Sequence, residues 1–397
     1  MASYPIYKET DLHQTEYRND DEAMMPATVI YHPGGIYNDH RRTWQGIPGI
    51  ERTKGGRIFV GFYSGTPTEA PGNYVLLVYS DDDGATFTSP YLAILPPTQN
   101  VRCFDECLWI DPNGVLHLYW AQSYGFMDGR IGVWESVCEA PNALEPKFTA
   151  PRRLANDIMM NKPIVLSSGE WILTCALYKD CNTPRTSDST LPTRTLDFSE
   201  EMYSNVYISK DGGKTFFLGG HNDYEDRLID EHMCIERKDG SIWMLIRARH
   251  GIGESASYDK GMTWTDTRDS ELGGPCARFC IRRLKSGKML LINHHEFVGR
   301  NNLKAMLSED EGKTWRCFLI LDDRTPVTYP DMTEDDAGNI YVTYDFDRYG
   351  ESEILMTKII EEDILHGKLV SEGSYLRHLV NKATGYKPHR TKRLPNQ

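Results

Sequence analysis

The segment Gly240-Ser-Ile-Trp-Met-Leu-Ile246 is one copy of a unit that the chain repeats: a polar turn ending in glycine, then an apolar strand. Five further copies begin at Gly56, Gly114, Gly169, Gly287 and Gly338. Successive glycines lie 47 to 71 residues apart, which suits a four-stranded antiparallel blade with loops of variable length. Each glycine stands where a tight hairpin needs positive φ. The repeat therefore predicts an all-β fold, a six-bladed β-propeller of four-stranded antiparallel blades.

A second motif, Ser-x-Asp-x-Gly-x-Thr-(Phe/Trp), recurs out of phase with the first. Its copies are Ser80–Phe87, Ser209–Phe216, Ser257–Trp264 and Ser308–Trp315. In such a turn the aspartate accepts hydrogen bonds from nearby backbone N–H groups, and the glycine supplies positive φ. The closing aromatic can pack between sheets. We therefore interpret the four aspartates as structural groups, not catalytic ones.

Composition narrows the class of partner. A net charge of −13 over 397 residues argues against nucleic acid, which rewards clustered Lys and Arg. A small anionic substrate stays open, because a few converging arginines can oppose the bulk charge within one pocket. The basic run from Lys382 to Arg393 is interpreted as a solvated terminus. Residues 1–30 hold no apolar segment of the signal-peptide type, and no apolar run is long enough to cross a membrane. The sequence thus predicts a cytoplasmic protein, or a secreted or periplasmic one if a signal was removed, with no membrane partner.

The cysteines predict neither disulfides nor a metal site. There are nine, an odd number, and several stand inside apolar runs, as small buried hydrophobic residues do. Cys103 and Cys107, like Cys276 and Cys280, are four apart, but no second pair at zinc-ligand spacing accompanies them. We expect no metal and no cofactor.

The Ser-x-Asp-x-Gly-x-Thr-(Phe/Trp) motifs are called Asp boxes below. With these boxes on a six-bladed scaffold, the chain resembles the sialidase (neuraminidase) superfamily of BNR-repeat proteins over about residues 25–360. The expected organisation is an N-terminal segment at 1–24, the propeller at 25–360, and a C-terminal helix and tail at 361–397 that can pack on it. The resemblance implies a carbohydrate substrate, an oligosaccharide or a glycoconjugate. It implies an exo-acting glycoside hydrolase for a terminal acidic sugar, sialic acid or another. The oligomeric state is left open.

Two arginines and a glutamate match the site of that superfamily. Arg247 follows a buried strand directly, where a guanidinium is costly unless it meets an anion or a carboxylate. By resemblance Arg247 and Arg300 are the second and third arginines of a carboxylate-binding triad, and Glu231 is the glutamate that activates the nucleophile. A structural Arg–Glu pair and a solvated loop arginine are the alternatives.

The resemblance assigns Tyr329 as the nucleophile. A tyrosine with its ordinary pKa of about 10 needs a nearby carboxylate to take its proton, and Glu231 fits that role. Such a nucleophile is known for sialidases. A tyrosine buried only for packing is the alternative.

The acid that protonates the leaving group has two candidates. The superfamily places an aspartate in the loop after the first repeated strand, where this chain offers Glu69. Asp105 is the second candidate. Further substrate contacts are predicted for residues near the channel, namely Arg102, Lys162, His232 and Asp331.

One departure from the superfamily concerns the first arginine of the triad. The segment Trp44-Gln-Gly-Ile-Pro48 keeps the Ile-Pro pair, but Gly46 stands where the arginine is expected. Losing one arm of the clamp removes charge-assisted hydrogen bonds. Arg42, Arg102 and Lys162 are the candidate replacements. The sugar therefore stays open, and so do a uronate-type polysaccharide lyase, with His232 or Tyr329 as base, and a non-catalytic glycan-binding propeller.

Overall fold

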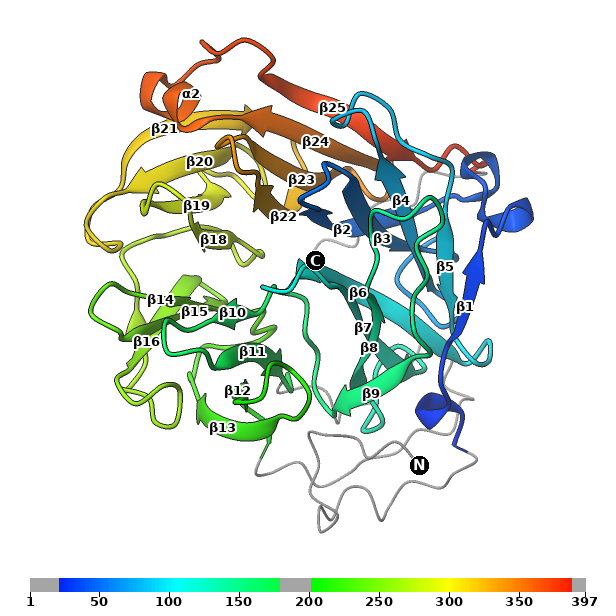
Figure 1. The fold of residues 1–397 in the computed structure, drawn as a ribbon, viewed down its shortest axis with the longest axis horizontal. Helices are drawn as coiled ribbons and strands as arrows, with labels where there is room; N and C mark the ends of the chain where they lie inside the picture. Colours follow the sequence, from blue (N-terminus) through cyan, green and yellow to red (C-terminus); the bar gives the residue numbers. More distant parts are fainter. Residues whose placement is uncertain (1–20, 179–200, 388–397) are drawn as a thin grey trace.

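The computed structural model describes residues 21–178 and 201–387. Six antiparallel sheets stand around a central axis, and in each sheet the strand order runs outward from one innermost strand (Figure 1). This confirms the predicted six-bladed β-propeller. We number the blades along the chain, from blade 1 (β1–β5) to blade 6 (β22–β25).

The strands take equivalent places in the blades. The innermost strands are β2 (Gln45–Arg52), β6 (Val101–Ile110), β10 (Ile164–Val165), β14 (Met233–Glu236), β18 (Cys280–Arg283) and β22 (Val327–Glu334). The second strands are β3 (Ile58–Ser64), β7 (Leu116–Tyr124), β11 (Trp171–Ala176), β15 (Ile242–Ala248), β19 (Met289–His294) and β23 (Ile340–Phe346). The third strands are β4 (Tyr74–Ser80), β8 (Gly132–Cys138), β12 (Ser204–Ser209), β16 (Gly251–Ser257), β20 (Leu303–Ser308) and β24 (Glu353–Ile359). The fourth strands are β5 (Leu92–Leu95), β9 (Arg152–Ala155), β13 (Phe217–Asn222), β17 (Arg268–Asp269), β21 (Arg316–Asp322) and β25 (Tyr375–Lys382).

The repeated glycine-and-strand unit is the second strand of every blade. These strands are buried along almost their whole length. Neighbouring blades cover both of their faces, so they read as continuous apolar runs without polar alternation. The hydrophobic core accordingly lies between blades as well as within them.

The Asp boxes join the third and fourth strands of blades 1, 3, 4 and 5. In the first box, Asp82 accepts hydrogen bonds from the Thr86 backbone N–H at 2.9 Å and from the Ser80 hydroxyl at 2.7 Å. Hydrogen bonds from Thr86 and Ser80 lower the pKa of Asp82 to about 2. Gly213 has φ +80°, and a Cβ there would lie 2.3 Å from the Trp171 ring. The structural interpretation of the boxes is confirmed.

The ends of the propeller differ from the predicted boundaries. β1 (Thr28–Tyr31) pairs with β5 and gives blade 1 a fifth, outermost strand. The helix α2 (Glu361–His366) packs beside β21, but β25 then pairs with β24 as the fourth strand of blade 6. The propeller therefore extends beyond residue 360, and the boundary expected there is too early. The short 3-10 helices are η1 (Glu22–Met24), η2 (Gly35–Tyr37) and η3 (Asp39–Arg41). Residues 1–20 of the predicted N-terminal segment and 388–397 of the tail lie outside the described residues.

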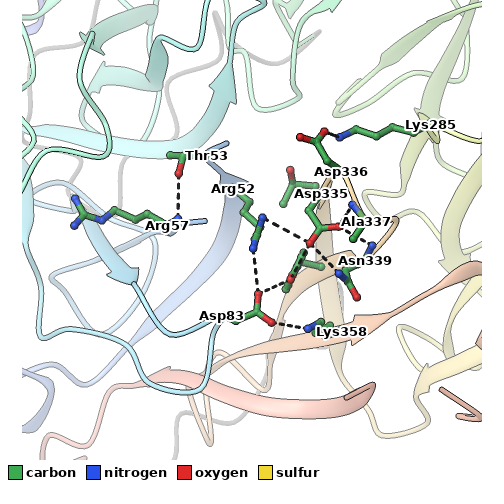
Figure 2. Close-up of polar contacts among 12 residues, drawn as sticks. Arg52, Thr53, Arg57, Asp83, Lys285, Asp335, Asp336, Ala337, Asn339 and Lys358 are labelled. Atoms are coloured by element: carbon green, nitrogen blue, oxygen red, sulfur yellow. Dashed lines mark hydrogen bonds and ion pairs between the residues drawn. The ribbon is translucent and has the colours of Figure 1, made fainter. Parts of the chain in front are cut away.

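The ring closes between blade 1 and blade 6 without a shared strand, because each of these sheets is built from its own stretch of chain. Side chains make the joint instead. Figure 2 shows Arg52 of blade 1 between Asp83, at 3.4 Å, and Asp335 of blade 6, at 3.6 Å. Lys358 of blade 6 pairs with the other oxygen of Asp83.

Within the described residues, eight cysteines are free, and Cys181 falls outside that part of the chain. No group of three or more His, Cys, Asp or Glu side chains is placed there to hold a metal ion. None of the helices in residues 21–178 and 201–387 has the length and apolar character needed to cross a membrane.

Candidate active site

A cavity opens over the channel at the end where the innermost strands begin. Its lining comes from the inner strands and from the loops beside them. The lining residues are Ile47, Glu69, Arg102, Phe104, Asp105, Phe126, Met127, Tyr178, Leu228, Ile229, Glu231 and Tyr329. All four predicted catalytic residues, Glu69, Asp105, Glu231 and Tyr329, thus meet in one place.

The backbone aims four of these side chains by the same device. Ile47, Asp105, Glu231 and Tyr329 have left-handed φ values of +56°, +49°, +34° and +57°. Ile47, Asp105 and Tyr329 stand at register shifts in β2, β6 and β22, and Glu231 precedes β14. A bulge breaks the alternation of a strand and redirects one side chain, here toward the axis. Left-handed backbone is costly for non-glycine residues, most of all for a β-branched one, and such strain gathers at functional sites.

The phenol of Tyr329 lies against Glu231 and Arg247. Its Oη is 3.2 Å from Oε1 of Glu231, and Nη1 of Arg247 is 3.4 Å from the same Oη. Arg247 also pairs with Oε2 of Glu231 at 2.6 Å. Burial and the charge of Glu231 raise the pKa of Tyr329 to about 12, against the opposing effect of nearby guanidinium groups. At neutral pH the phenol is therefore protonated and can give its proton to Glu231.

Three guanidinium groups surround this phenol. Besides Arg247, the Cζ atoms of Arg300 and Arg348 lie 5.8 Å and 4.9 Å from the centre of the Tyr329 ring. Arg247 and Arg300 both donate to the Cys276 carbonyl, at 3.3 Å and 3.0 Å, which holds them side by side. Planar guanidinium groups that are held rigidly suit a carboxylate, which can accept two charge-assisted hydrogen bonds from one of them.

Arg348 fills the space that the glycine at position 46 leaves. A Cβ on Gly46 would lie 2.1 Å from Cδ of Arg348, so any larger residue must displace this side chain. Arg348 is oriented by Glu69 at 3.0 Å and Asp345 at 3.5 Å. A third arginine is therefore present, but it comes from blade 6 instead of blade 1.

Arg348 was not among the predicted site residues, although the sequence offers a signal for it. Arg348 comes two residues after the end of β23, and Arg247 stands in the same region of blade 4, next to the last residue of β15. Of the three candidate replacements for the missing arginine, Arg42 is engaged by Asp39 at 2.6 Å and by Asn381 at 2.7 Å.

Of the two candidate acids, Asp105 is the one without a cationic partner. Glu69 is held by Arg348. Asp105 makes no hydrogen bond or ion pair with another side chain within the described residues. Burial raises the pKa of Asp105 to about 7, with Arg102 opposing that rise and the charges of Glu69 and Glu231 adding to it. A carboxyl group that is half protonated at neutral pH can serve as both acid and base.

Lys162 and Asp331 do not line this cavity. The ammonium of Lys162 lies inside the channel, 2.6 Å from the Leu108 carbonyl and 3.0 Å from Asp331. Lys162 also borders a second cavity, of about 350 Å³, at the other mouth of the channel. Asp331 accepts from the Ile50 N–H at 2.9 Å as well. The two predicted substrate contacts form instead an internal ion pair across the channel.

His232 is also turned away from the cavity. Its Nε2 hydrogen-bonds the Asn205 carbonyl at 2.7 Å, and burial lowers its pKa to about 4. Arg102, in contrast, lines the cavity beside Asp105. Of the predicted substrate contacts, Arg247, Arg300 and Arg102 lie at the site, whereas Lys162, His232 and Asp331 support the channel around it.

Comparisons with known proteins match this fold. Residues 98–342 match the BNR repeat-like domain family. No curated protein is significantly similar to the chain. A Hadza microbial sialidase is 16% identical, with a TM-score of 0.61 over 80% of this chain and 66% of its own, so the match spans just under two thirds of that sialidase.

Two further solved structures are similar. The intramolecular trans-sialidase of Ruminococcus gnavus, in complex with oseltamivir carboxylate, is 11% identical with a TM-score of 0.63, over 85% of this chain and 98% of its own. The sialidase of Trypanosoma rangeli, in complex with sialic acid, is 14% identical with a TM-score of 0.56, over 82% of this chain and 56% of its own. At these identities the likeness is one of fold.

Proposed function

The chain belongs to the BNR repeat-like domain family and has the six-bladed fold of the sialidase superfamily, and from this premise we propose that it is an exo-acting, retaining glycoside hydrolase for a terminal acidic sugar. The observation that carries the proposal is the contact of the Tyr329 phenol with Glu231, 3.2 Å apart, among three arginines. A buried phenol that serves only packing has no need of a carboxylate acceptor within a cluster of guanidinium groups.

In the first step Asp105 donates its proton to the glycosidic oxygen as the bond to the anomeric carbon breaks. The Tyr329 Oη forms a new bond to that carbon, and its proton passes to Glu231. The products of this step are the free aglycone, a glycosyl-tyrosine, a neutral Glu231 and an ionised Asp105. Charge and protons therefore balance within the site.

In the second step water attacks the anomeric carbon, and Asp105 takes the proton of that water. The bond to Tyr329 breaks, and the phenolate recovers its proton from Glu231. Two displacements at one carbon return the original anomeric configuration. The site is then ready for the next substrate.

The three arginines favour a substrate whose terminal sugar carries a carboxylate. A neutral phenol approaches such an anionic sugar without the repulsion that a carboxylate nucleophile would meet. Sialosides and uronides are the leading candidates, and one of the similar solved structures is a sialidase in complex with sialic acid. The ion pair of Arg247 with Glu231, 2.6 Å apart, holds the proposed base in place beside the phenol.

A panel of 4-nitrophenyl glycosides with sialyl, uronyl and neutral sugars tests the proposal. We expect release of nitrophenol from an acidic glycoside. Proton NMR should show that the sugar released first has the same anomeric configuration as the substrate. Inversion would rule out a glycosyl-tyrosine. An unsaturated product absorbing in the ultraviolet would identify a lyase, and binding without turnover a glycan-binding propeller.

Exchanging Gly46 and Arg348 tests whether the third arginine has moved between blades. Arg348→Ala is expected to raise KM for the acidic glycoside by roughly 10- to 100-fold, because one charge-assisted pair with the substrate is lost. Gly46→Arg alone should also be impaired, because its side chain must displace Arg348. The double variant places an arginine at 46 with the space of Arg348 empty, and it is expected to recover part of the lost affinity.

Steady-state kinetics of the four proteins on the hydrolysed glycoside gives the answer. Arg42→Ala serves as the control, since Arg42 is held by Asp39 and Asn381 away from the cavity. If the double variant is as weak as the worse single variant, or if Arg348→Ala leaves KM unchanged, position 348 does not replace the arginine absent at 46.

A further inference from the structure

Arg102 is a buried cation whose plane is fixed by aromatic rings. It is 1% exposed and belongs to β6 of blade 2. Its Cζ lies 3.7 Å from the ring centre of Phe104 and 4.7 Å from that of Phe126. The two phenyl groups therefore hold the guanidinium at the cavity wall, which Arg102, Phe104 and Phe126 all line.

The hydrogen-bonding capacity of this guanidinium is almost unused. Within the described residues its one hydrogen bond runs from Nη1 to the Phe126 carbonyl, a long contact of 3.5 Å. Among residues 21–178 and 201–387, its Nε has no acceptor and no carboxylate lies within ion-pair distance. Burying a charged group without a partner is costly, and a well-placed anion offsets that cost. The missing partner is expected to come from outside the chain.

Asp105 is close to Arg102 in sequence but is not that partner. The two side chains do not pair, and a carboxyl group that donates a proton must be neutral when substrate binds. Arg102 does act on it at a distance, opposing the rise in the Asp105 pKa. A guanidinium placed to hold Asp105 ionised would stand in direct contact with it, as Arg348 stands with Glu69 at 3.0 Å.

The position of Arg102 in the ring separates it from the three arginines around Tyr329. Blade 2 faces blade 5, which carries Arg300, across the axis (Figure 1). Arg102 and Asp105 come from the same strand and line the same wall. Because Asp105 protonates the departing oxygen in the proposed reaction, this wall is the one that meets the leaving group.

We propose that Arg102 binds a second acidic group of the substrate, on the leaving-group side, so that the natural substrate is a terminal acidic sugar joined to a second acidic unit. This inference rests on the proposed function and narrows it. The reacting sugar is held by Arg247, Arg300 and Arg348, and the carboxylate of the next unit by Arg102. Homopolymers and disaccharides of acidic sugars have this character.

Calorimetric titration of the Tyr329→Phe protein, which should bind without turnover, tests the inference with matched disaccharides. One pair is α2→8-linked disialic acid and α2→3-sialyllactose, and the other is glucuronyl-glucuronate and glucuronyl-glucose. In the pair whose terminal sugar is accepted, the diacid is expected to bind about tenfold tighter, one charge-assisted contact. Adding Arg102→Met should remove the preference and leave the monoacid affinity nearly unchanged.

The controls separate a contact with the ligand from a structural effect. Arg102→Lys keeps the charge and should keep part of the preference. Arg282→Met removes an arginine that borders the cavity at the other mouth of the channel and should change neither affinity. Thermal melting shows whether each variant folds, and Arg102→Gln replaces Arg102→Met if the methionine variant does not.

Each outcome decides something different. Equal binding of diacid and monoacid, or a preference that survives Arg102→Met, overturns the second acidic site while the hydrolase proposal stands. An equal loss of both affinities in Arg102→Met assigns Arg102 to the framework of the cavity and also overturns it. If no acidic disaccharide binds and no acidic glycoside is cleaved, the proposed function itself fails.

Discussion

Replacing Tyr329 with phenylalanine is expected to lower kcat for the accepted acidic glycoside by roughly 1,000-fold or more, because the variant lacks the atom that bonds to the anomeric carbon. The substrate should still bind, since its carboxylate meets arginines and not the phenol oxygen. KM should therefore change far less than kcat. Stopped assays with a sensitive fluorogenic aglycone measure the residual rate.

Trapping of the intermediate gives the same prediction a second measurement. A substrate analogue fluorinated beside the anomeric carbon should leave its glycosyl group on the wild-type protein, and peptide mass mapping should place it on Tyr329. Tyr344→Phe is the matched control: the Tyr344 hydroxyl, in blade 6, contacts Asp322 of blade 5 at 3.2 Å, and neither residue lines the cavity. A Tyr329→Phe protein that hydrolyses the substrate at the wild-type rate would refute the tyrosine nucleophile.

Asp105→Asn is expected to lower kcat/KM by about 100- to 10,000-fold on substrates with poor leaving groups, the usual contribution of a general acid. The defect should be much smaller with 4-nitrophenol, which departs without protonation. In the wild-type protein, kcat/KM should fall as pH rises through about 7, where the Asp105 proton is lost. That alkaline limb should disappear in the variant.

The same substitution should make the protein more stable above neutral pH. The pKa of Asp105 rises from 3.8 to about 7 on folding, so ionisation favours the unfolded chain. The protonated Asp105 therefore contributes its full stabilisation of the wild type below about pH 4. This contribution is lost progressively between about pH 4 and pH 7. Asn has no such cost, and at pH 8 we expect a gain of up to about 4 kcal/mol in the free energy of unfolding.

Urea unfolding at pH 5 and pH 8 measures this difference, and Glu69→Gln is the control. Glu69 is bound to Arg348, so its loss should act through the orientation of that arginine and raise KM. A Glu69→Gln protein with the large kcat defect, beside a nearly normal Asp105→Asn protein, would exchange the roles of the two carboxyl groups.

The sequence predicted those features of the fold that depend on short stretches of residues. The glycine turns, the Asp boxes and the apolar second strands are short-range features, and they fix the blade count. The pairing of Tyr329 with Glu231 was predicted by the resemblance to the sialidase superfamily and not by local pattern. Their distance of 3.2 Å agrees with the assigned roles.

The errors concern contacts between residues far apart in the chain. Arg348 meets Gly46 because blade 6 lies beside blade 1, a relation that spacing does not reveal. Lys162 has the charge of a substrate contact, but Asp331 and the Leu108 carbonyl hold it within the channel. The end of the propeller was placed too early because β25 follows a helix and a loop, and a strand at the outer edge of a blade has a weaker apolar signal.

The closure of the ring without a shared strand has a consequence for synthesis. The Ile47 N–H donates to Asp345 at 2.8 Å, so the active-site bulge of the first blade is completed by the last. Tyr329 and Arg348 leave the ribosome only after the strands of all five preceding blades, which end at Asp322, have emerged. A nascent chain therefore lacks the proposed nucleophile and the third guanidinium, and the candidate site is complete only with the last blade.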